Sequence, residues 1–133
     1  MNPIMPATCW ALAAALLATS VRAADVADVT QTLLQTFQSS GAGAFSASDG
    51  KALWFQEANG RSCTNCHSKD VNSSGSHQRT GKVIEPMSPS ANPRRLTDQK
   101  KVNKWFKRNC KWTLGRDCTA QEKGDTLLWL SQQ

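Results

Sequence analysis

Two cysteines and a histidine at fixed spacing carry the most specific chemistry in the chain. Two residues separate Cys63 from Cys66, and His67 follows directly. Cys-x-x-Cys-His is the attachment signature of a c-type haem, because thiols three positions apart on one helical turn can add to the two vinyl groups of the macrocycle. The imidazole of His67 then supplies the proximal axial bond to the iron. The motif predicts one covalently held haem c.

Two other kinds of site use a Cys-x-x-Cys pair. A thioredoxin-like redox motif requires a βαβ context, whereas the residues around Cys63 are Gly, Asn, Ser and Lys. A four-thiolate zinc site would need Cys110 and Cys118 as its second pair. Zinc ligand pairs are usually about two to four residues apart, whereas seven residues separate these two. The sequence therefore favours haem attachment.

Residues 1–23 have the composition of an export signal. An apolar run from Trp10 to Ala18 precedes small residues, and we expect cleavage after Ala23. The residues ahead of the run include no Lys or Arg, so a retained membrane anchor is the alternative. The run is shorter than the roughly 20 apolar residues of a membrane span, which favours removal.

Cleavage would leave residues 24–133 as a single cytochrome domain in the bacterial periplasm. Haem is added to Cys-x-x-Cys-His motifs on that side of the inner membrane, so the signal and the motif support each other. Removal takes away Cys9 and leaves four cysteines, two for haem and two spare. In an oxidising compartment Cys110 and Cys118 most simply form a disulfide, worth roughly 2 to 3 kcal/mol on a chain-entropy estimate.

The mature chain is basic. Sixteen Lys and Arg less Arg22 leaves 15, against 10 acidic residues, for a net charge of +5. Such a charge could steer an acidic redox partner toward the haem edge, and an ordinary solvated face is the alternative. The export signal disfavours nucleic acid as a partner. Nine of the basic residues crowd one region: Arg94, Arg95, Lys100, Lys101, Lys104, Lys107, Arg108, Lys111 and Arg116.

Helical periodicity surrounds the haem motif. A Pro-, Gly- and Ser-rich stretch at 68–96 predicts a long loop over the haem. The whole is the all-α arrangement of small class I cytochromes c, in which the haem forms much of the core. The expected helices run from Asp25 or Asp28 to about Phe37, from Ser46 or Ser48 to about Ala58, from Thr97-Asp98 to about Asn109, and from a capping box at Thr119–Glu122 toward the C-terminus.

The residue on the distal side of the iron separates a plain electron carrier from a gas-binding haem. Met87, in a loop flanked by prolines, would keep both oxidation states six-coordinate and raise the potential. It follows His67 by only 20 residues, and simple packing against the haem face is its alternative role. His77 would be required for a bis-histidine haem, but it lies in a polar stretch and we expect it to face solvent.

Several segments spread over the mature chain resemble the sphaeroides haem protein type of monohaem cytochrome c. That family is similar to class I cytochromes in fold, but its distal ligand is an asparagine on a loop braced by a disulfide. The resemblance implies that Asn109 is the distal ligand and that Cys110 and Cys118 form the brace. The segments are Lys104–Cys110, Gly115–Thr119, Arg79–Lys82, the Pro-Ser-Ala-Asn-Pro run at 89–93, Glu122–Asp125 and Leu127–Leu130.

The chemistry of an amide ligand agrees with this assignment. An amide oxygen is a hard donor that suits ferric iron better than ferrous iron, so reduction should release Asn109. The freed position could then take oxygen, nitric oxide or carbon monoxide. As a non-ligand, Asn109 would be a helix C-cap, which is compatible with the same place.

The expected function is therefore a periplasmic cytochrome that transfers electrons and binds a diatomic gas when reduced. The resemblance implies a di-haem cytochrome c and a membrane cytochrome b as redox partners. An ordinary electron carrier that uses Met87 is one alternative. A haem enzyme that acts on nitric oxide, oxygen or peroxide is another. An enzyme of that kind wants a distal acid–base residue, and only His77 qualifies by type, so we expect no catalytic residues.

Overall fold

The protein is all-α, as predicted. The computed structural model describes residues 13–133, with side chains described from Asp25 onward. Part of the predicted export signal, residues 1–12, lies outside the described residues. No helix in the described part of the chain is long and apolar enough to cross a membrane. The elements are α1 (Ala13–Ser39), α2 (Ala47–Phe55), α3 (Thr64–His67), β1 (Gly75–Ser76), β2 (Val83–Ile84), α4 (Gln99–Leu114) and α5 (Ala120–Ser131).

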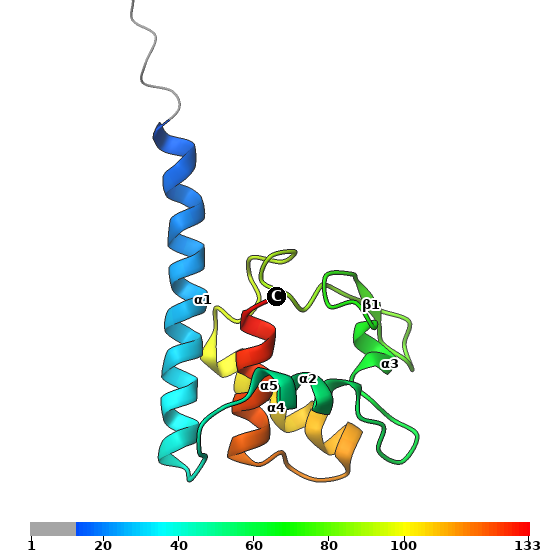
Figure 1. Cartoon of the computed structure of the whole chain (residues 1–133). Coiled ribbons are helices and arrows are strands. Elements are labelled where there is room, and N and C mark those ends of the chain that lie inside the picture. Colours follow the sequence, from blue (N-terminus) through cyan, green and yellow to red (C-terminus); the bar gives the residue numbers. More distant parts are fainter. Residues whose placement is uncertain (1–12) are drawn as a thin grey trace, which may run out of the picture.

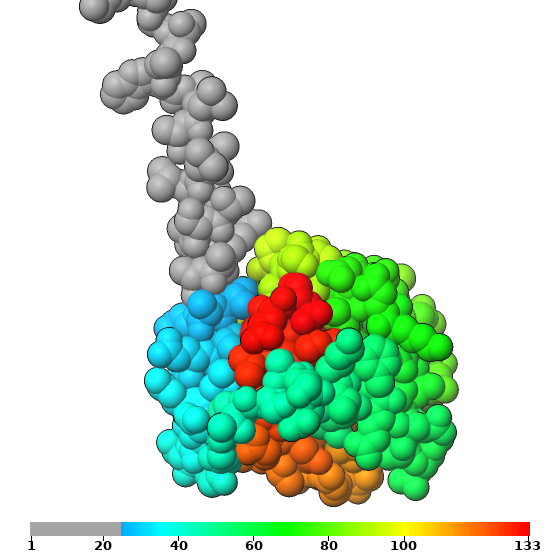
Figure 2. Space-filling view, viewed as in Figure 1, coloured from blue at the N-terminus to red at the C-terminus, as the bar shows by residue number. Residues whose placement is uncertain are grey.

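Helix α5 is the centre of the fold. It packs against both α1 and α2, and α1 lies along one side of the molecule while α3 and the β1–β2 hairpin lie on the other (Figure 1). The space-filling view shows the segment that contains α2 crossing in front of α5 (Figure 2). The buried apolar cluster is contributed by α1, α2, α5 and the loops: Val29, Leu33, Phe37, Trp54, Val71, Leu96, Leu127, Trp129 and Leu130.

Helices α2 and α5 meet backbone to backbone. A Cβ atom at Gly50 would collide with the carbonyl oxygen of Asp125. The buried carboxylate of Asp125 accepts the Ser46 N–H at 2.8 Å and the Gln121 Nε2–H at 2.9 Å. Because Ser46 is also the N-cap of α2, one carboxylate of α5 fixes where α2 begins.

The predicted capping box of α5 is present. The Thr119 hydroxyl accepts the Glu122 N–H at 3.1 Å, and Glu122 Oε2 accepts the Thr119 N–H at 2.8 Å. Two hydrogen bonds from the Arg116 guanidinium to the Glu122 carboxylate, at 2.7 and 2.8 Å, complete the cap. The Arg116 hydrogen bonds are the main reason that the pKa of Glu122 falls from 4.5 to about 2, and the Thr119 N–H adds to the effect.

This cap should make the protein acid-sensitive over a defined range. The native-state pKa of Glu122 is below the unfolded value of 4.5, so its contribution is complete above pH 4.5 and disappears as the pH falls toward 2. We expect wild type to lose about 2 kcal/mol more than Glu122→Gln between pH 6 and pH 2.5, allowing for the exposed Arg116. Urea unfolding at each pH measures this, with Glu57→Gln at an exposed carboxylate as the control. Equal losses in wild type and Glu122→Gln would contradict the prediction.

Three features of the fold differ from the prediction. Helix α1 begins at Ala13, so neither Asp25 nor Asp28 is its N-cap. Helix α4 continues past Asn109 to Leu114 and ends at Gly115, whose left-handed φ of 71° suits glycine. The expected loop at 68–96 contains the two short strands, paired antiparallel as Gly75 with Ile84 and Ser76 with Val83.

Candidate haem site

The haem motif forms a single tight turn. Cys63 is the N-cap of α3, and Cys66 and His67 lie within it. Both cysteines are free and half-buried. The His67 N–H bonds the Cys63 carbonyl at 3.1 Å, and the Asn65 side chain accepts the Ser62 N–H at 2.5 Å. Two thiols and one imidazole are thus presented from one short, hydrogen-bonded segment.

The imidazole of His67 is held in its neutral form. Its ring packs 5.3 Å from that of Trp54, which in turn lies 5.6 Å from Trp129. Burial, with a smaller contribution from the Arg95 cation, lowers the pKa of His67 to about 4. Among the described residues, nothing hydrogen-bonds the buried Nδ1 of His67 or the buried Nε1 of Trp54.

The β1–β2 hairpin supports the motif from outside. A Cβ at Gly75 would collide with the Cys66 carbonyl oxygen and would also crowd the Cα of His67. The backbone of β1 therefore lies directly on the turn that carries Cys66 and His67. Glycine at position 75 is required by this close approach.

The C-terminal end of helix α4, which is distant from the motif in the sequence, lies near the motif in the structure. Burial raises the pKa of the Cys63 thiol to about 11, and a hydrogen bond with the Thr113 side chain partly opposes this rise. Thr113 is itself buried. Asn109 is half-buried one helical turn earlier on the same face. It lies inside α4 and is not the helix C-cap, because Gly115 takes that position.

Cys110 and Cys118 are joined by a disulfide with a Cα–Cα distance of 5.5 Å. The bridge is buried and ties the interior of α4 to the residue before the N-cap of α5. It also consumes the thiols that a four-cysteine zinc site would need. No group of three or more His, Cys, Asp or Glu side chains in the described region is arranged to hold a metal ion.

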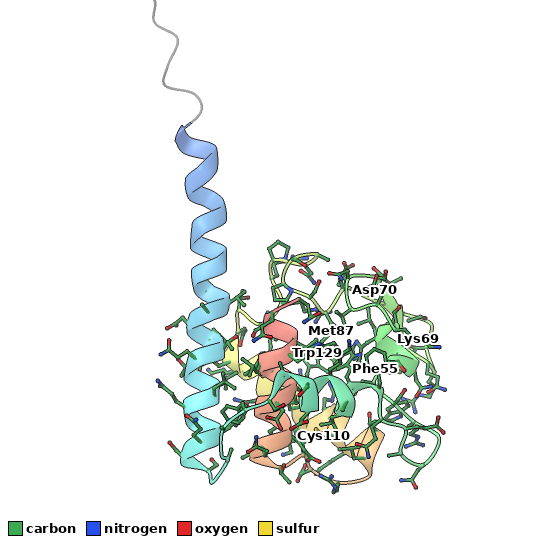
Figure 3. The ribbon with its side chains drawn as sticks, viewed as in Figure 1. Phe55, Lys69, Asp70, Met87, Cys110 and Trp129 are labelled. Carbon is green, nitrogen blue, oxygen red and sulfur yellow. A yellow bond between two sulfur atoms is a disulfide. The ribbon has the colours of Figure 1, made fainter. Side chains whose placement is uncertain are left out.

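The two other candidate ligands are positioned differently. Met87 is half-buried against the core, and its N–H bonds the Val71 carbonyl at 2.9 Å. Figure 3 shows Met87, Phe55 and Trp129 toward the middle of the molecule between α5 and α3. His77 is exposed, as predicted. Its Nδ1 accepts the Thr80 N–H at 3.2 Å in the hairpin turn.

Three partly exposed aromatic side chains were not singled out as site residues from the sequence. Phe55, Trp105 and Trp112 are 43%, 48% and 36% exposed, although side chains of this size normally have an apolar partner. Position 112 follows 105 by seven residues, so helical periodicity could have paired the two tryptophans. Two free thiols and a neutral imidazole beside the ring of Trp54 fit a flat, apolar macrocycle such as haem c.

Comparison with known proteins places this chain among the c-type cytochromes. A family described as a domain of unknown function (DUF1924) matches residues 40–130. The cytochrome c-type protein SHP of Cereibacter sphaeroides is 48% identical over 92 residues, which are 65% of this chain and 70% of that protein. Cytochrome c'' of Methylophilus methylotrophus is 34% identical over 90 residues, covering 64% and 62% of the two chains.

Solved structures of two c-type cytochromes superpose on this chain. Oxidised SHP, described as an oxygen-binding cytochrome c, superposes with a TM-score of 0.73 at 41% identity, covering 78% of this chain and 96% of that one. Oxidised cytochrome c'' from Methylophilus methylotrophus superposes with a TM-score of 0.68 at 28% identity, covering 84% and 96%.

Fold and site together define a monohaem cytochrome of the c type, with a covalently bound haem c. The chain belongs to the DUF1924 family and is a cytochrome c of the SHP type.

Proposed function

We propose that this cytochrome carries electrons and binds a diatomic gas in its ferrous state, with Asn109 as a distal ligand that leaves on reduction. Cys63 and Cys66 would hold the haem by thioether bonds, and His67 would be the proximal ligand. Haem c supplies an iron that changes oxidation state and accepts an axial ligand.

One observation carries the choice of Asn109. Arg61, two residues before Cys63, donates from Nη1 to the carbonyl of Trp112 at 3.0 Å, and Trp112 lies three residues beyond Asn109 on α4. The face of α4 that bears Asn109 is therefore next to the haem motif. The neighbouring Cys110 anchors this part of the helix through the disulfide.

The expected behaviour of Asn109 follows from its amide oxygen. As a neutral, hard donor, the oxygen binds ferric iron better than ferrous iron, so reduction weakens the bond. The helix and the disulfide keep the freed amide close, where it can hydrogen-bond an incoming ligand or rebind. His67 would keep its position in both oxidation states, because it belongs to α3 and its N–H bonds the Cys63 carbonyl. The related SHP is an oxygen-binding cytochrome c, and the solution structure of cytochrome c'' bears on haem-ligand detachment.

Export and partner choice belong to the same proposal. Residues 1–23 would direct the chain to the periplasm and be removed near Ala23, leaving 24–133 as the cytochrome domain. Helix α4 contains six Lys and Arg and no acidic residue, which supports docking of an acidic redox protein. A di-haem cytochrome c and a membrane cytochrome b are the partners that we propose. We propose an electron-transfer and gas-binding role rather than an enzymatic one, because His77, the candidate acid–base residue, is exposed and its Nδ1 accepts the Thr80 N–H.

Two substitutions test the distal assignment. Asn109→Ala should convert the ferric haem to a five-coordinate or water-bound, high-spin form, because the amide donor is lost. Met87→Ala is the matched control and should leave the ferric spectrum nearly unchanged. Optical and spin-resonance spectra of both oxidised variants measure this.

The reverse pattern would make the protein an ordinary His/Met electron carrier. In wild type, we expect a high-spin ferrous spectrum that changes on addition of carbon monoxide. A low-spin ferrous form that ignores the gas would overturn the gas-binding proposal.

A further inference from the structure

Two tryptophans lie on either side of Asn109 along α4. Trp105, Asn109 and Trp112 are spaced by four and three residues, which places them on one face of the helix. The core side of α4 is marked by Val102, Phe106, Cys110 and Thr113. Asn109 lies at the edge of that side, and the two partly exposed indoles continue the same edge toward both ends of the helix.

Each indole is held by an arginine. The Arg108 guanidinium lies over the Trp105 ring at 5.6 Å, and that of Arg61 lies over the Trp112 ring at 5.0 Å. Such cation–π contacts are worth about 0.5 to 1 kcal/mol at exposed sites. Arg61 also donates from Nη1 to the backbone carbonyl of Trp112 at 3.0 Å, which holds this guanidinium beside the ring.

The contacts between Arg61 and Trp112 connect the segment just before the haem motif to helix α4, which carries Asn109. Arg61 stands two residues before Cys63, in an antiparallel bridge with Ala58, whereas Trp112 belongs to α4. The indole of Trp112 is therefore located where α4 faces the haem-bearing segment.

We propose that Trp105 and Trp112 form the two walls of the distal ligand site and make it selective for small, neutral diatomic molecules. This inference rests on the proposed role of Asn109. A charged ligand such as azide must shed its hydration to lie between two indoles, whereas a neutral diatomic gas loses little. The two arginines are exposed, so solvent and salt screen their charges. They act mainly by holding the rings.

Ligand binding to matched variants tests the walls. Trp105→Ala and Trp112→Ala should each raise azide affinity of the oxidised protein roughly tenfold, about the factor that 1.4 kcal/mol represents. Each should also accelerate carbon monoxide association after flash photolysis of the reduced protein. Trp112→Phe keeps an aromatic wall and should stay near wild type. Lys104→Ala is the control for loss of a charge elsewhere on the exposed surface of α4.

Arg61→Ala provides a milder test that leaves both indoles in the chain. We expect its azide affinity to lie between those of wild type and Trp112→Ala, because Trp112 would lose its anchor. Unchanged affinity and association rates in both Trp→Ala variants, with a wild type that binds carbon monoxide, would overturn the wall proposal alone. A reduced wild type that does not bind carbon monoxide would overturn the proposed function, and this inference with it.

Discussion

Gly50→Ala should destabilise the protein by about 2 to 3 kcal/mol, even though alanine is the better helix former. The added methyl group would collide with the carbonyl oxygen of Asp125 and with the following amide nitrogen, Thr126 N. Both are backbone atoms of α5, so no rotation of a flexible side chain can relieve the collision. The α2 and α5 helices would have to separate, which would expose part of the core that includes Trp54 and Leu127. Urea unfolding of the haem-loaded protein measures the loss.

Gly43→Ala is the matched control for Gly50→Ala. A Cβ at Gly43 would meet only Gln121 Oε1, at an ordinary contact distance of 3.7 Å. We expect its stability to stay within about 0.5 kcal/mol of wild type. Similar unfolding midpoints for the two variants would show that the α2–α5 contact is not as close as the structure has it.

Gly75→Ala should produce a protein of which the larger part lacks haem. The new methyl group would push the Cys66 carbonyl and the Cα of His67, and the two thiols could not keep the spacing that attachment needs. We expect the fraction that does acquire haem to be destabilised by about 2 to 3 kcal/mol. Haem content per chain, from the ratio of Soret to protein absorbance and from the mass of the intact protein, checks the result.

Ser76→Ala tests whether the hairpin position or the glycine itself matters. Ser76 is the neighbouring residue of β1 and is exposed, so its substitution should leave haem content at the wild-type level. A full complement of haem in Gly75→Ala would contradict the close contact between β1 and α3.

The chemistry of the site could be predicted further than its packing. The Cys-x-x-Cys-His motif indicated haem c, and the pairing of Cys110 with Cys118 is present in the structure. These features depend on residue type and short spacing. The close approaches at Gly50 and Gly75 depend on which distant backbone segment arrives there, and nothing in the local sequence specifies that segment. Glycine was the only available signal, and it does not discriminate, because Gly41, Gly60, Gly81 and Gly115 have open space around them.

The extent of α4 shows that a helix boundary can be predicted wrongly even where the disulfide beside it is predicted correctly. The prediction ended this helix near Asn109 and treated 110–118 as a loop, because a disulfide closed it. The apolar period in fact continues, with Cys110 and Thr113 both buried. Gly115 supplies the left-handed stop, and it was the signal in the sequence that should have set the end. Only with the longer helix do Thr113 and Trp112 come to the haem motif.

The position of Asn109 within α4 also bears on the speed of the proposed ligand exchange. Its backbone is held by helical hydrogen bonds on both sides and by the adjoining disulfide, so the main chain is not free to swing away from the iron. Departure and return are then left to two torsion angles of one short side chain. Side-chain rotations are among the fastest motions in a protein, far faster than rearrangement of a loop or a domain. A cytochrome built in this way would open and close its iron within the time of an electron-transfer encounter, and delivery of the electron or of the gas would set the pace.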